Sequence, residues 1–253
     1  MLKRLPILLA LAICIAGAPL LASFARSGKA TSTPAEVELT NEPHHHLVLE
    51  NEYVRAFQVE VPPHDATQMH RHRHDYIYVT LGASDLSNEV AGKSPVSLKL
   101  QDGETHFTPG NFAHIARNLA DTPFRNVTVE FLQDEKAKQA PPWDEERGLH
   151  VLNAGTQEIL FVKDGVRVAD IQLQPGGSIP RHHHAGPHLV IAVTDLELRS
   201  DVEAKAATPA QAESGSARGQ LKSGDVKWVP GGFTHTLTNI GKQPARFITL
   251  EFR

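Results

Sequence analysis

The sequence predicts an all-β protein made of two similar barrels, and three observations support this prediction. Short runs that alternate apolar and polar residues are separated by proline and glycine turns, as at 54–61, 76–81, 127–131, 166–173 and 246–252. No long stretch has the apolar spacing of an amphipathic helix. The same order of motifs occurs twice along the chain, so each copy, 41–133 and 149–253, is expected to close its own barrel.

The first 25 residues differ from the rest of the chain. Residues 1–4 (MLKR) are basic, residues 5–21 are almost wholly apolar, and residues 23–25 (SFA) offer small side chains at a cleavage site. This pattern is typical of a Sec-type signal peptide, so we expect a secreted or periplasmic protein cut after Ala25. An uncleaved anchor is the alternative, although the apolar run contains Pro6 and Pro19 and falls short of the roughly 20 residues that span a bilayer.

Composition excludes several kinds of site and partner. Cys14 is the only cysteine and lies within the predicted signal peptide, so the mature chain would have neither disulfides nor thiolate ligands. The chain has 29 acidic and 25 basic residues, a formal net charge of −4, and no basic blocks. Nucleic acid is therefore not an expected partner, nor is a membrane once the signal is cleaved. A small-molecule ligand fits this composition, and nothing in the sequence decides between a monomer and a homo-oligomer.

The remaining segments connect the two copies or differ between them. Residues 26–40 are polar and rich in breakers, which predicts a linker, and residues 134–148 predict a charged connector. The copies match at an offset of 112 residues in their first halves and 121 in their second halves. The second copy therefore has nine additional residues. They fall within 203–220, a polar segment of small residues that predicts an exposed loop.

The stretch 68–75 (QMHRHRHD) places a histidine at every second position. On a β-strand His70, His72 and His74 would point to one face, and Arg71 and Arg73 to the other. Neutral imidazole is the commonest metal ligand, and two ligands spaced two apart on a strand can bind one ion. The run 44–46 (HHH) has no partner at a defined spacing, so we interpret it as surface.

The second copy combines a histidine pair with a distant third histidine at fixed spacings. Its first motif is Gly176, five residues, His182-x-His184, three residues, His188, and its second motif is Gly224, five residues, Pro230-x-Gly232, two residues, His235, three residues, Asn239. These motifs resemble those of the cupin superfamily, and their duplication resembles a bicupin, with two tandem jelly-roll barrels. The first copy carries the same pattern with departures, such as Asn111 in place of the glycine before the last histidine. Asn118 and Asn239 are expected to cap or close turns.

The resemblance implies one divalent metal ion, Fe, Mn, Ni, Cu or Zn, in each barrel. In the second copy the implied ligands are His182, His184 and His235, with His188 where the family usually has glutamate. In the first copy they are His70, His72 and His114, with Tyr76 at the glutamate position, or Asp75 if the turn is one residue shorter. A phenol must lose a proton before it ligates well. We therefore expect the second site to hold metal more tightly and to be the place for any chemistry.

The function implied is that of a metal-dependent oxidoreductase. The chain resembles cupin dioxygenases, which bind a small chelating substrate beside Fe(II) and O₂. No independent nucleophile is evident, so chemistry would belong to the metal, and no catalytic residue can be assigned. Asp75, Tyr76, Tyr78 and His188 are the nearby acid–base candidates. A non-catalytic protein that binds a small ligand or metal is the alternative, because fold does not fix function.

Overall fold

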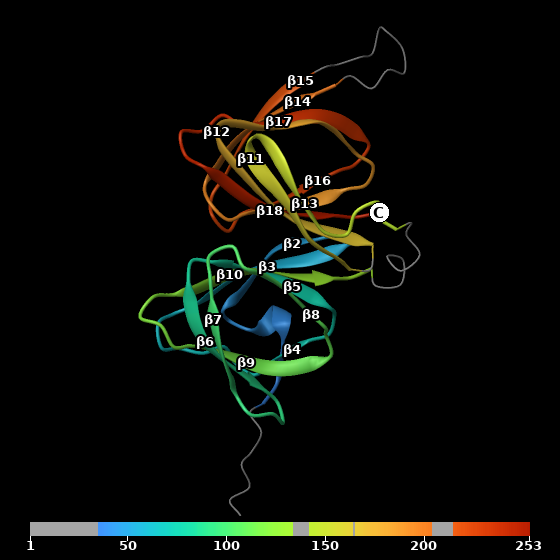
Figure 1. Ribbon diagram of the computed structural model, residues 1–253. Coiled ribbons are helices and arrows are strands. Elements are labelled where there is room, and N and C mark those ends of the chain that lie inside the picture. The colour runs from blue at the N-terminus through green and yellow to red at the C-terminus, as the bar shows by residue number, and fades with distance from the viewer. Residues whose placement is uncertain (1–34, 134–141, 164, 204–214) are drawn as a thin grey trace, which may run out of the picture. The chain divides into compact units, whose positions relative to one another are not determined.

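The computed structural model describes residues 35–133, 142–163, 165–203 and 215–253. The expected signal peptide with Cys14, most of the expected linker and part of the connector lie outside these residues. The described part of the chain is almost entirely β, with one short 3-10 helix, η1 (Leu39–Asn41). None of its helices is long and apolar enough to cross a membrane. The predicted all-β class is therefore confirmed (Figure 1).

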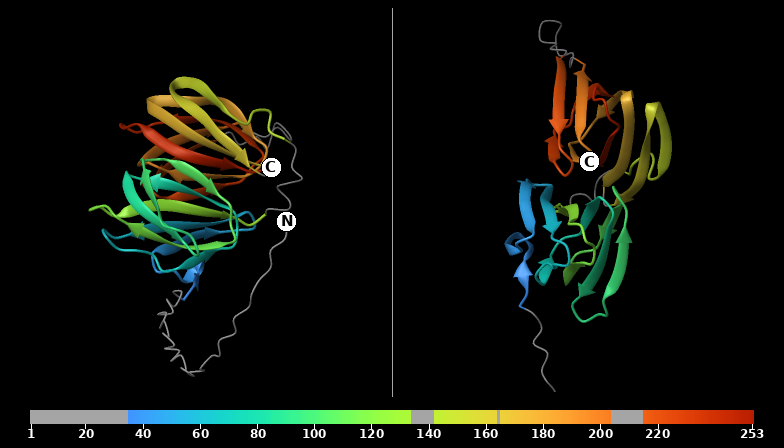
Figure 2. Two further views of the ribbon diagram at one scale, coloured as in Figure 1. Left: turned by 60° about the horizontal axis from the view of Figure 1, so that its bottom comes forward. Right: turned by 90° about the vertical axis from the view of Figure 1, so that its left-hand side faces the viewer.

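The first copy folds into two five-stranded sheets, β1-β4-β9-β6-β7 and β2-β3-β10-β5-β8. These are the two faces of a jelly-roll barrel (Figures 1 and 2). The strands are β1 (Val37–Glu38), β2 (His45–Glu50), β3 (Val54–Val61), β4 (His70–His72), β5 (Tyr76–Leu81), β6 (Ser84–Val90), β7 (Val96–Leu100), β8 (Thr105–Thr108), β9 (Phe112–Asn118) and β10 (Phe124–Phe131).

The first barrel begins before residue 41. Within the expected linker 26–40, Val37 and Glu38 form β1, which pairs in parallel with β4. Leu39 is buried in the apolar interior of the barrel, beside Phe57 and Val59. The end of the range 26–40 therefore belongs to the barrel. Its two apolar residues, Val37 and Leu39, follow the polar and breaker-rich part of the segment and contact the barrel.

The second copy repeats this arrangement in one eight-stranded sheet, ordered β15-β14-β17-β12-β18-β13-β16 with β11 paired to β12. The strand β12 is long because it continues through the positions that β3 and β4 occupy separately in the first copy. The strands are β11 (Gly148–Lys163), β12 (Val166–His184), β13 (His188–Ala192), β14 (Leu196–Val202), β15 (Gly215–Leu221), β16 (Val226–Val229), β17 (Phe233–Asn239) and β18 (Ala245–Glu251).

The segment 203–220 is only partly the loop that its composition predicts. Residues 215–221 form β15, which pairs with β14 from Val202↔Gly215 to Leu196↔Leu221. Residues 204–214 lie outside the described part of the chain. The prediction of a loop is therefore wrong for its last residues, because backbone pairing with β14 outweighs the weak strand propensity of glycine, serine and alanine.

Alternation along the strands divides the apolar residues between the barrel interiors and a shared cluster. In the first barrel Phe57, Val59 and Val61 point inward, whereas Val54 and Ala56 on the same strand belong to the shared cluster. Its members from the second copy include Val166, Val168, Leu189, Ile248 and Leu250. Every one of the residues named here is at most 4% exposed, so the shared cluster is as dry as the interior of a single domain.

The second motif folds into a tight turn that places the last histidine. A side chain at Gly110 or Gly231 would collide with the backbone at His74 or Gly186, respectively. The next residue is left-handed in both copies, with φ of 64° at Asn111 and 83° at Gly232. Asparagine is among the few residues other than glycine that tolerate this conformation, so the substitution at Asn111 preserves the turn. The expected turn-closing role of Asn118 and Asn239 is also confirmed, because each side-chain amide donates to backbone carbonyls around its turn.

Candidate metal centres

Strand pairing brings the three predicted histidines of the second barrel together. His182 and His184 lie on β12 with one residue between them, so both side chains leave the same face. His235 lies directly opposite His182 on the neighbouring strand β17. The pair and the distant histidine therefore meet through one register of the sheet.

The ring nitrogens of this triad converge on a single point. The Nε2 atoms lie 2.9 Å apart for His182 and His184, 3.0 Å for His182 and His235, and 3.2 Å for His184 and His235. Nitrogen ligands about 2.1 Å from a metal ion and at right angles to one another are about 3.0 Å apart. The triad therefore matches one face of an octahedral coordination shell.

The other ring nitrogen of each histidine is already bound to the protein. The Nδ1 of His182 donates to the Pro180 carbonyl at 2.8 Å, and the Nδ1 of His184 lies 3.0 Å from Glu251 Oε1. The Nδ1 of His235 is 2.6 Å from the Ser200 hydroxyl. A carbonyl oxygen can only accept, and an ionised carboxylate likewise, so these nitrogens carry the protons of His182 and His184.

These tautomers leave lone pairs on the converging Nε2 atoms. Burial lowers the pKa of His182, and burial together with His182 and His184 lowers the pKa of His235 to about 3, so neither ring gains a proton near neutral pH. Two neutral Nε2 atoms at 2.9 Å cannot hydrogen-bond to each other when each offers only a lone pair. A cation between them relieves this repulsion, so the donor set fits a metal ion.

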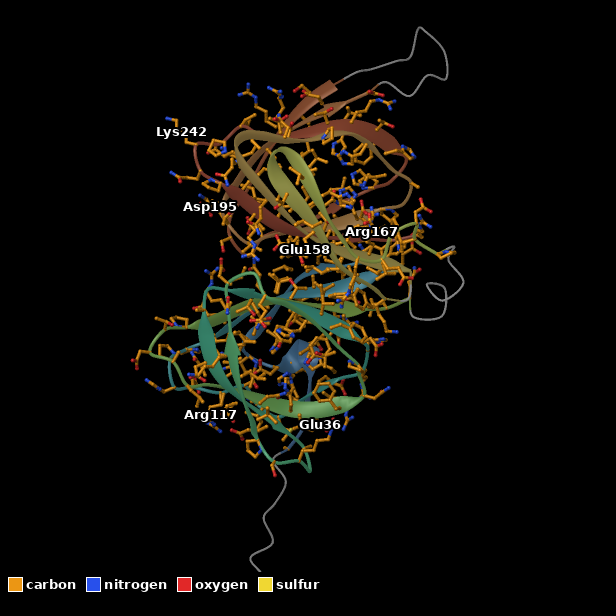
Figure 3. All side chains as sticks on the ribbon, in the orientation of Figure 1. Glu36, Arg117, Glu158, Arg167, Asp195 and Lys242 are labelled. Atoms are coloured by element: carbon orange, nitrogen blue, oxygen red, sulfur yellow. The ribbon has the colours of Figure 1, made fainter. Side chains whose placement is uncertain are left out.

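The carboxylate behind His184 is a functional residue that the sequence reasoning missed. Burial raises the pKa of Glu251, but the hydrogen bond to His184 and the charge of Arg167 outweigh this effect and lower it to about 2. Arg167, labelled in Figure 3, lies across the strand pair β12–β18 from Glu251. A carboxylate that accepts from a ligating imidazole fixes its tautomer and increases its basicity. The sequence signal for this residue is the repeated ending of the two copies, "VTVEF" at 127–131 and "ITLEF" at 248–252, which places a glutamate at the same position in each.

His188 lies beside the triad and is not part of its nitrogen cluster. Its ring stacks on His184 with centroids 4.1 Å apart and planes at 19°. The group of donor atoms that lie within 4.8 Å of one another comprises His182, His184 and His235. Burial, followed by the charge of His184, lowers the pKa of His188 to about 4, and its buried Nδ1 has no hydrogen-bond partner among the described residues.

The first barrel gathers the equivalent three histidines. His70 pairs with His114 across β4 and β9, and His72 follows on the same face of β4. The ring centroids are 4.5 Å apart for His70 and His114, and 5.2 Å for His72 and His114. The Nδ1 of His70 donates to the Gln68 carbonyl at 2.8 Å, and the Nδ1 of His114 is 2.7 Å from Asn88 Oδ1. The Nε2 atoms of His70 and His114 are buried and have no partner among the described residues, as expected of metal ligands without their ion.

Tyr76 and Asp75, the two alternatives for a fourth ligand of the first barrel, both face other partners. Tyr76 stacks on His72 with centroids 4.0 Å apart, as His188 does on His184. Burial raises the pKa of its phenol, which disfavours the phenolate that would ligate. Asp75 Oδ1 accepts from the Gly110 backbone N–H at 2.8 Å and so holds the turn of the second motif.

The interpretation of residues 44–46 as surface is wrong for His45. His46 is exposed, but His45 is only 9% exposed and forms a group of candidate metal ligands with His70 and His72. Its ring centroid is 4.8 Å from that of His70. The sequence gave no spacing signal, because β2 joins the site through its pairing with β3 and not through a motif.

The arginines of the histidine-rich stretch 68–75 face outward, as the alternation of side chains along a strand predicts. Arg71 forms an ion pair with Glu36, which Figure 3 labels, and Arg73 forms one with Glu38. Both acids belong to the segment around β1. The imidazoles of His70 and His72 therefore face the barrel interior, while the guanidinium groups of Arg71 and Arg73 tie the preceding segment to β4.

The two candidate centres open into cavities of different size. The cavity of the first barrel has a volume of about 110 Å³ and is lined by all four histidines, with Tyr76, Tyr78 and Phe124 among its walls. The cavity of the second barrel has a volume of about 320 Å³. Its lining is mainly apolar, with His188, Ser200, Arg218, Gln220, Lys227 and His235 as the polar side chains.

Comparison with solved structures identifies proteins of the same architecture. Oxalate decarboxylase from Lactobacillus farciminis, solved as a formate complex, matches with a TM-score of 0.58 at 14% identity over 83% of this chain and 84% of that chain. Oxalate decarboxylase from Bacillus subtilis, described with Mn(II) centres, gives 0.56 at 13% identity over 85% and 76%. Vicilin from Capsicum annuum gives 0.60 at 17% identity over 79% and 76%. Comparison with protein-family profiles and with curated protein sequences gives no match for this chain.

Proposed function

Starting from a chain with the two-barrel cupin fold, we propose that the second barrel binds a divalent metal ion through His182, His184 and His235 and places it beside a small-molecule site. The observation that carries the proposal is the convergence of three Nε2 atoms within 3.2 Å while their Nδ1 atoms are bound elsewhere. A triad of this kind occupies one side of an ion and leaves its other side for a ligand, which is the usual arrangement in catalytic metal sites.

The adjoining cavity favours a small, partly apolar ligand that carries an anionic group. Its volume of about 320 Å³ lies within the range of small-molecule sites. Arg218 and Lys227 add positive charge to the lining, and the Nδ1 of His188 is available to hydrogen-bond a bound molecule. Leucine, valine and phenylalanine side chains form most of the remaining wall. A bound divalent ion would supply Lewis-acid chemistry, or electron transfer if it is redox-active.

The donor set narrows the choice of metal. Imidazole ligands suit Fe, Ni, Cu and Zn, whereas Mn favours sites that include carboxylate oxygens. Oxalate decarboxylases with Mn(II) share the fold, and Glu251 supplies a carboxylate only behind His184, not among the converging donors. We therefore infer that the second barrel binds a metal ion that suits three neutral nitrogen ligands. Fe(II) is the first candidate if the protein is an oxidoreductase that acts on a chelating substrate.

The test is metal analysis followed by a substrate panel. Protein purified without a histidine tag is loaded separately with Fe(II), Mn(II), Ni(II), Cu(II) or Zn(II). It is then incubated with oxalate, enediols, β-diketones, flavonols and hydroxyaromatic acids while O₂ uptake and CO₂ release are followed. We expect turnover with at least one metal–substrate pair, and its loss in the control variant His182→Ala/His184→Ala.

Two other outcomes have defined meanings. Ligand-induced stabilisation without turnover would support the alternative function, a non-catalytic protein that binds a small molecule at its metal. A protein that retains no metal and is stabilised by no member of the panel would overturn the proposal.

We also propose that the protein acts outside the cytoplasm, on the strength of the signal-like pattern of residues 1–25. Mass spectrometry of protein from its native host should find a mature chain that begins at Arg26. An intact Met1 on membrane-bound protein would identify the segment as an anchor instead.

A further inference from the structure

We propose that His45, which lies outside both cupin motifs, is the fourth ligand of a closed four-histidine metal site in the first barrel, with His70, His72 and His114. This inference rests on the proposed binding of divalent metal by these barrels, and it adds a ligand that neither the motif spacing nor the resemblance assigns. It also assigns the first barrel a different role from the second, namely holding a metal ion without presenting it to a substrate.

The position of His45 is set by strand pairing. Residue 45 pairs with Val59 on β3, and both side chains are buried. The neighbouring His46 and Leu47 are exposed on the same strand. One histidine of the run is therefore directed into the barrel while its neighbour is directed to solvent.

A buried carboxylate orients the ring of His45. Glu42 is 2% exposed, and its Oε2 lies 2.6 Å from His45 Nδ1. The same carboxylate accepts the backbone N–H groups of His44 at 2.9 Å and Gln68 at 3.1 Å. Because Glu42 acts only as an acceptor in these contacts, the Nδ1 of His45 carries the proton and its Nε2 carries the lone pair. A carboxylate, an imidazole and an ion in this order form a common arrangement around bound metals.

His45 belongs to a group of candidate donors in the first barrel. One donor atom from each of His45, His70 and His72 lies within 4.8 Å of the others, and His114 adjoins this group through His70, with ring centroids 4.5 Å apart. The Nε2 atoms of His70 and His114 are buried without a hydrogen bond among the described residues. A cavity with a volume of about 110 Å³ lies among these rings, which is well below the roughly 300 Å³ at which small-molecule sites begin. The space suits an ion with four protein ligands better than an ion with a bound substrate.

Packing alone does not account for the pair of Glu42 and His45. His45 contacts the edge of Phe57 at a centroid distance of 6.0 Å, a contact that an apolar side chain could also make. Burying a carboxylate is unfavourable unless its charge is compensated, so the need to fill space would not select this pair. The second barrel shows that the fold does not need it, because Gln157 pairs with Ile171 where His45 pairs with Val59, and Ala154 stands where Glu42 stands.

The experiment isolates the first barrel in the full-length chain. In a His182→Ala/His184→Ala background, bound Co(II) reports the first site, and its amount and visible spectrum are measured after removal of free metal. We introduce His45→Gln, which installs the residue of the second barrel, and compare it with His46→Gln, a matched change on the exposed side of the same strand. Glu42→Gln tests the orienting carboxylate.

We expect the background protein to hold one Co(II) per chain, with the intense visible bands of a four-coordinate ion. His45→Gln should weaken Co(II) binding at least 100-fold and change the spectrum, Glu42→Gln should weaken it 10- to 100-fold, and His46→Gln should leave both unchanged. Unaltered Co(II) affinity and spectrum in His45→Gln, or no Co(II) in the background protein, would overturn the inference.

The controls separate this result from the proposed function and from misfolding. Co(II) bound by a His70→Ala/His72→Ala protein reports the second barrel alone, so the proposed function can stand while the inference fails, and the reverse. If His45→Gln does not fold, Glu42→Gln and the nitrogen hyperfine pattern of bound Cu(II) in the background protein decide. Coupling to four nitrogens supports the assignment, and coupling to three contradicts it.

Discussion

The two barrels hold their histidines with partners at equivalent positions. At the offset of 112 residues, the carbonyl of Gln68 corresponds to that of Pro180, and Asn88 corresponds to Ser200. At the offset of 121, Glu130, which lies 3.6 Å from His72 Nδ1 without a hydrogen bond to it, corresponds to Glu251, which lies 3.0 Å from His184 Nδ1. The duplication has therefore preserved the residues that orient the ligands, including positions where the side chain itself has changed.

The difference between the barrels is where the fourth imidazole lies. In the first barrel it is His45 on β2, and Tyr76 is stacked on His72. In the second barrel β2's counterpart carries Gln157, and the stacked position carries His188. Each barrel thus has four imidazoles, but the group of candidate donors includes His45 in the first barrel, with His70 and His72, whereas in the second it consists of the three motif histidines without His188. In the proposed first site the fourth imidazole lies among the donors and closes the site, whereas in the second barrel it lies in the wall of a larger cavity and leaves one side of the triad open.

Removing the histidine pair of each barrel should give the largest effect. At limiting metal we expect His182→Ala/His184→Ala to lose most of the bound ion and His70→Ala/His72→Ala to lose little. The three Nε2 atoms of the second triad already lie within 3.2 Å of one another, whereas the grouped donors of the first barrel lie within 4.8 Å and do not include His114, so the second site needs less rearrangement to bind an ion. Elemental analysis after equilibration with less than one ion per chain measures this. Equal losses would place the two sites on a par, and the reverse order would make the first barrel the preferred site.

Removing the carboxylates behind the histidines should give a smaller effect that again differs between the barrels. Glu251 lies 3.0 Å from His184 Nδ1, whereas Glu130 lies 3.6 Å from His72 Nδ1. Burial raises the pKa of Glu130, while His184 and Arg167 outweigh burial at Glu251 and lower its pKa. Glu251→Gln should therefore weaken metal binding about 10- to 100-fold in the second barrel. Glu130→Gln should weaken binding in the first barrel less, as titration calorimetry on the single-site backgrounds can show.

The smallest effect concerns the metal-free protein and pH. Burial and neighbouring histidines lower the pKa values of His70 and His72 to about 3 from an ordinary value of 6.5. These rings gain protons only on unfolding between those values, so the free energy of unfolding should fall as pH drops below about 6.5. Each ring contributes at most about 1.4 kcal/mol per pH unit.

Urea midpoints of the metal-free protein at pH 7.5 and 5.5 measure this dependence. Replacing His70 and His72 by glutamine should flatten it more than replacing His182 and His184, because His182 is only half-buried. A midpoint that is independent of pH in the unsubstituted protein would show that these rings stay accessible to protons in the folded state.

Much of the fold and both histidine triads could be predicted because they depend on local spacing. The alternation of apolar residues identified β3, β5, most of β10, the first part of β12, and β18, and the HxH pairs with their distant partners identified the triads. The repeat supplied a second copy against which each motif could be checked.

The remaining features depend on tertiary contacts that spacing does not encode. His45 reaches the first site through the pairing of β2 with β3, which is interrupted by a bulge between Leu47 and Leu49. Tyr76 and His188 have the spacing of a ligand, but stacking on the adjacent histidine fixes their rings elsewhere. Val37 belongs to the first barrel because it pairs in parallel with β4, and Leu39 belongs to it because its side chain is buried in the barrel interior.

The order in which the second triad can form follows from the separation of its members along the chain. His182 and His184 are two residues apart, but His235 is 51 residues beyond His184, and Glu251 orients His184 from a different strand. Contacts between residues this far apart in the sequence form late in folding, because the entropy lost when the intervening loop closes must be compensated by the contacts made after closure. Of the second site, an unfolded chain can thus offer an ion only the local pair His182 and His184, and the full donor set arises when β17 and β18 pair with β12. The rate at which metal is captured during refolding should therefore follow closure of the barrel, which makes a spectroscopically visible ion such as Co(II) a reporter of the last steps of folding.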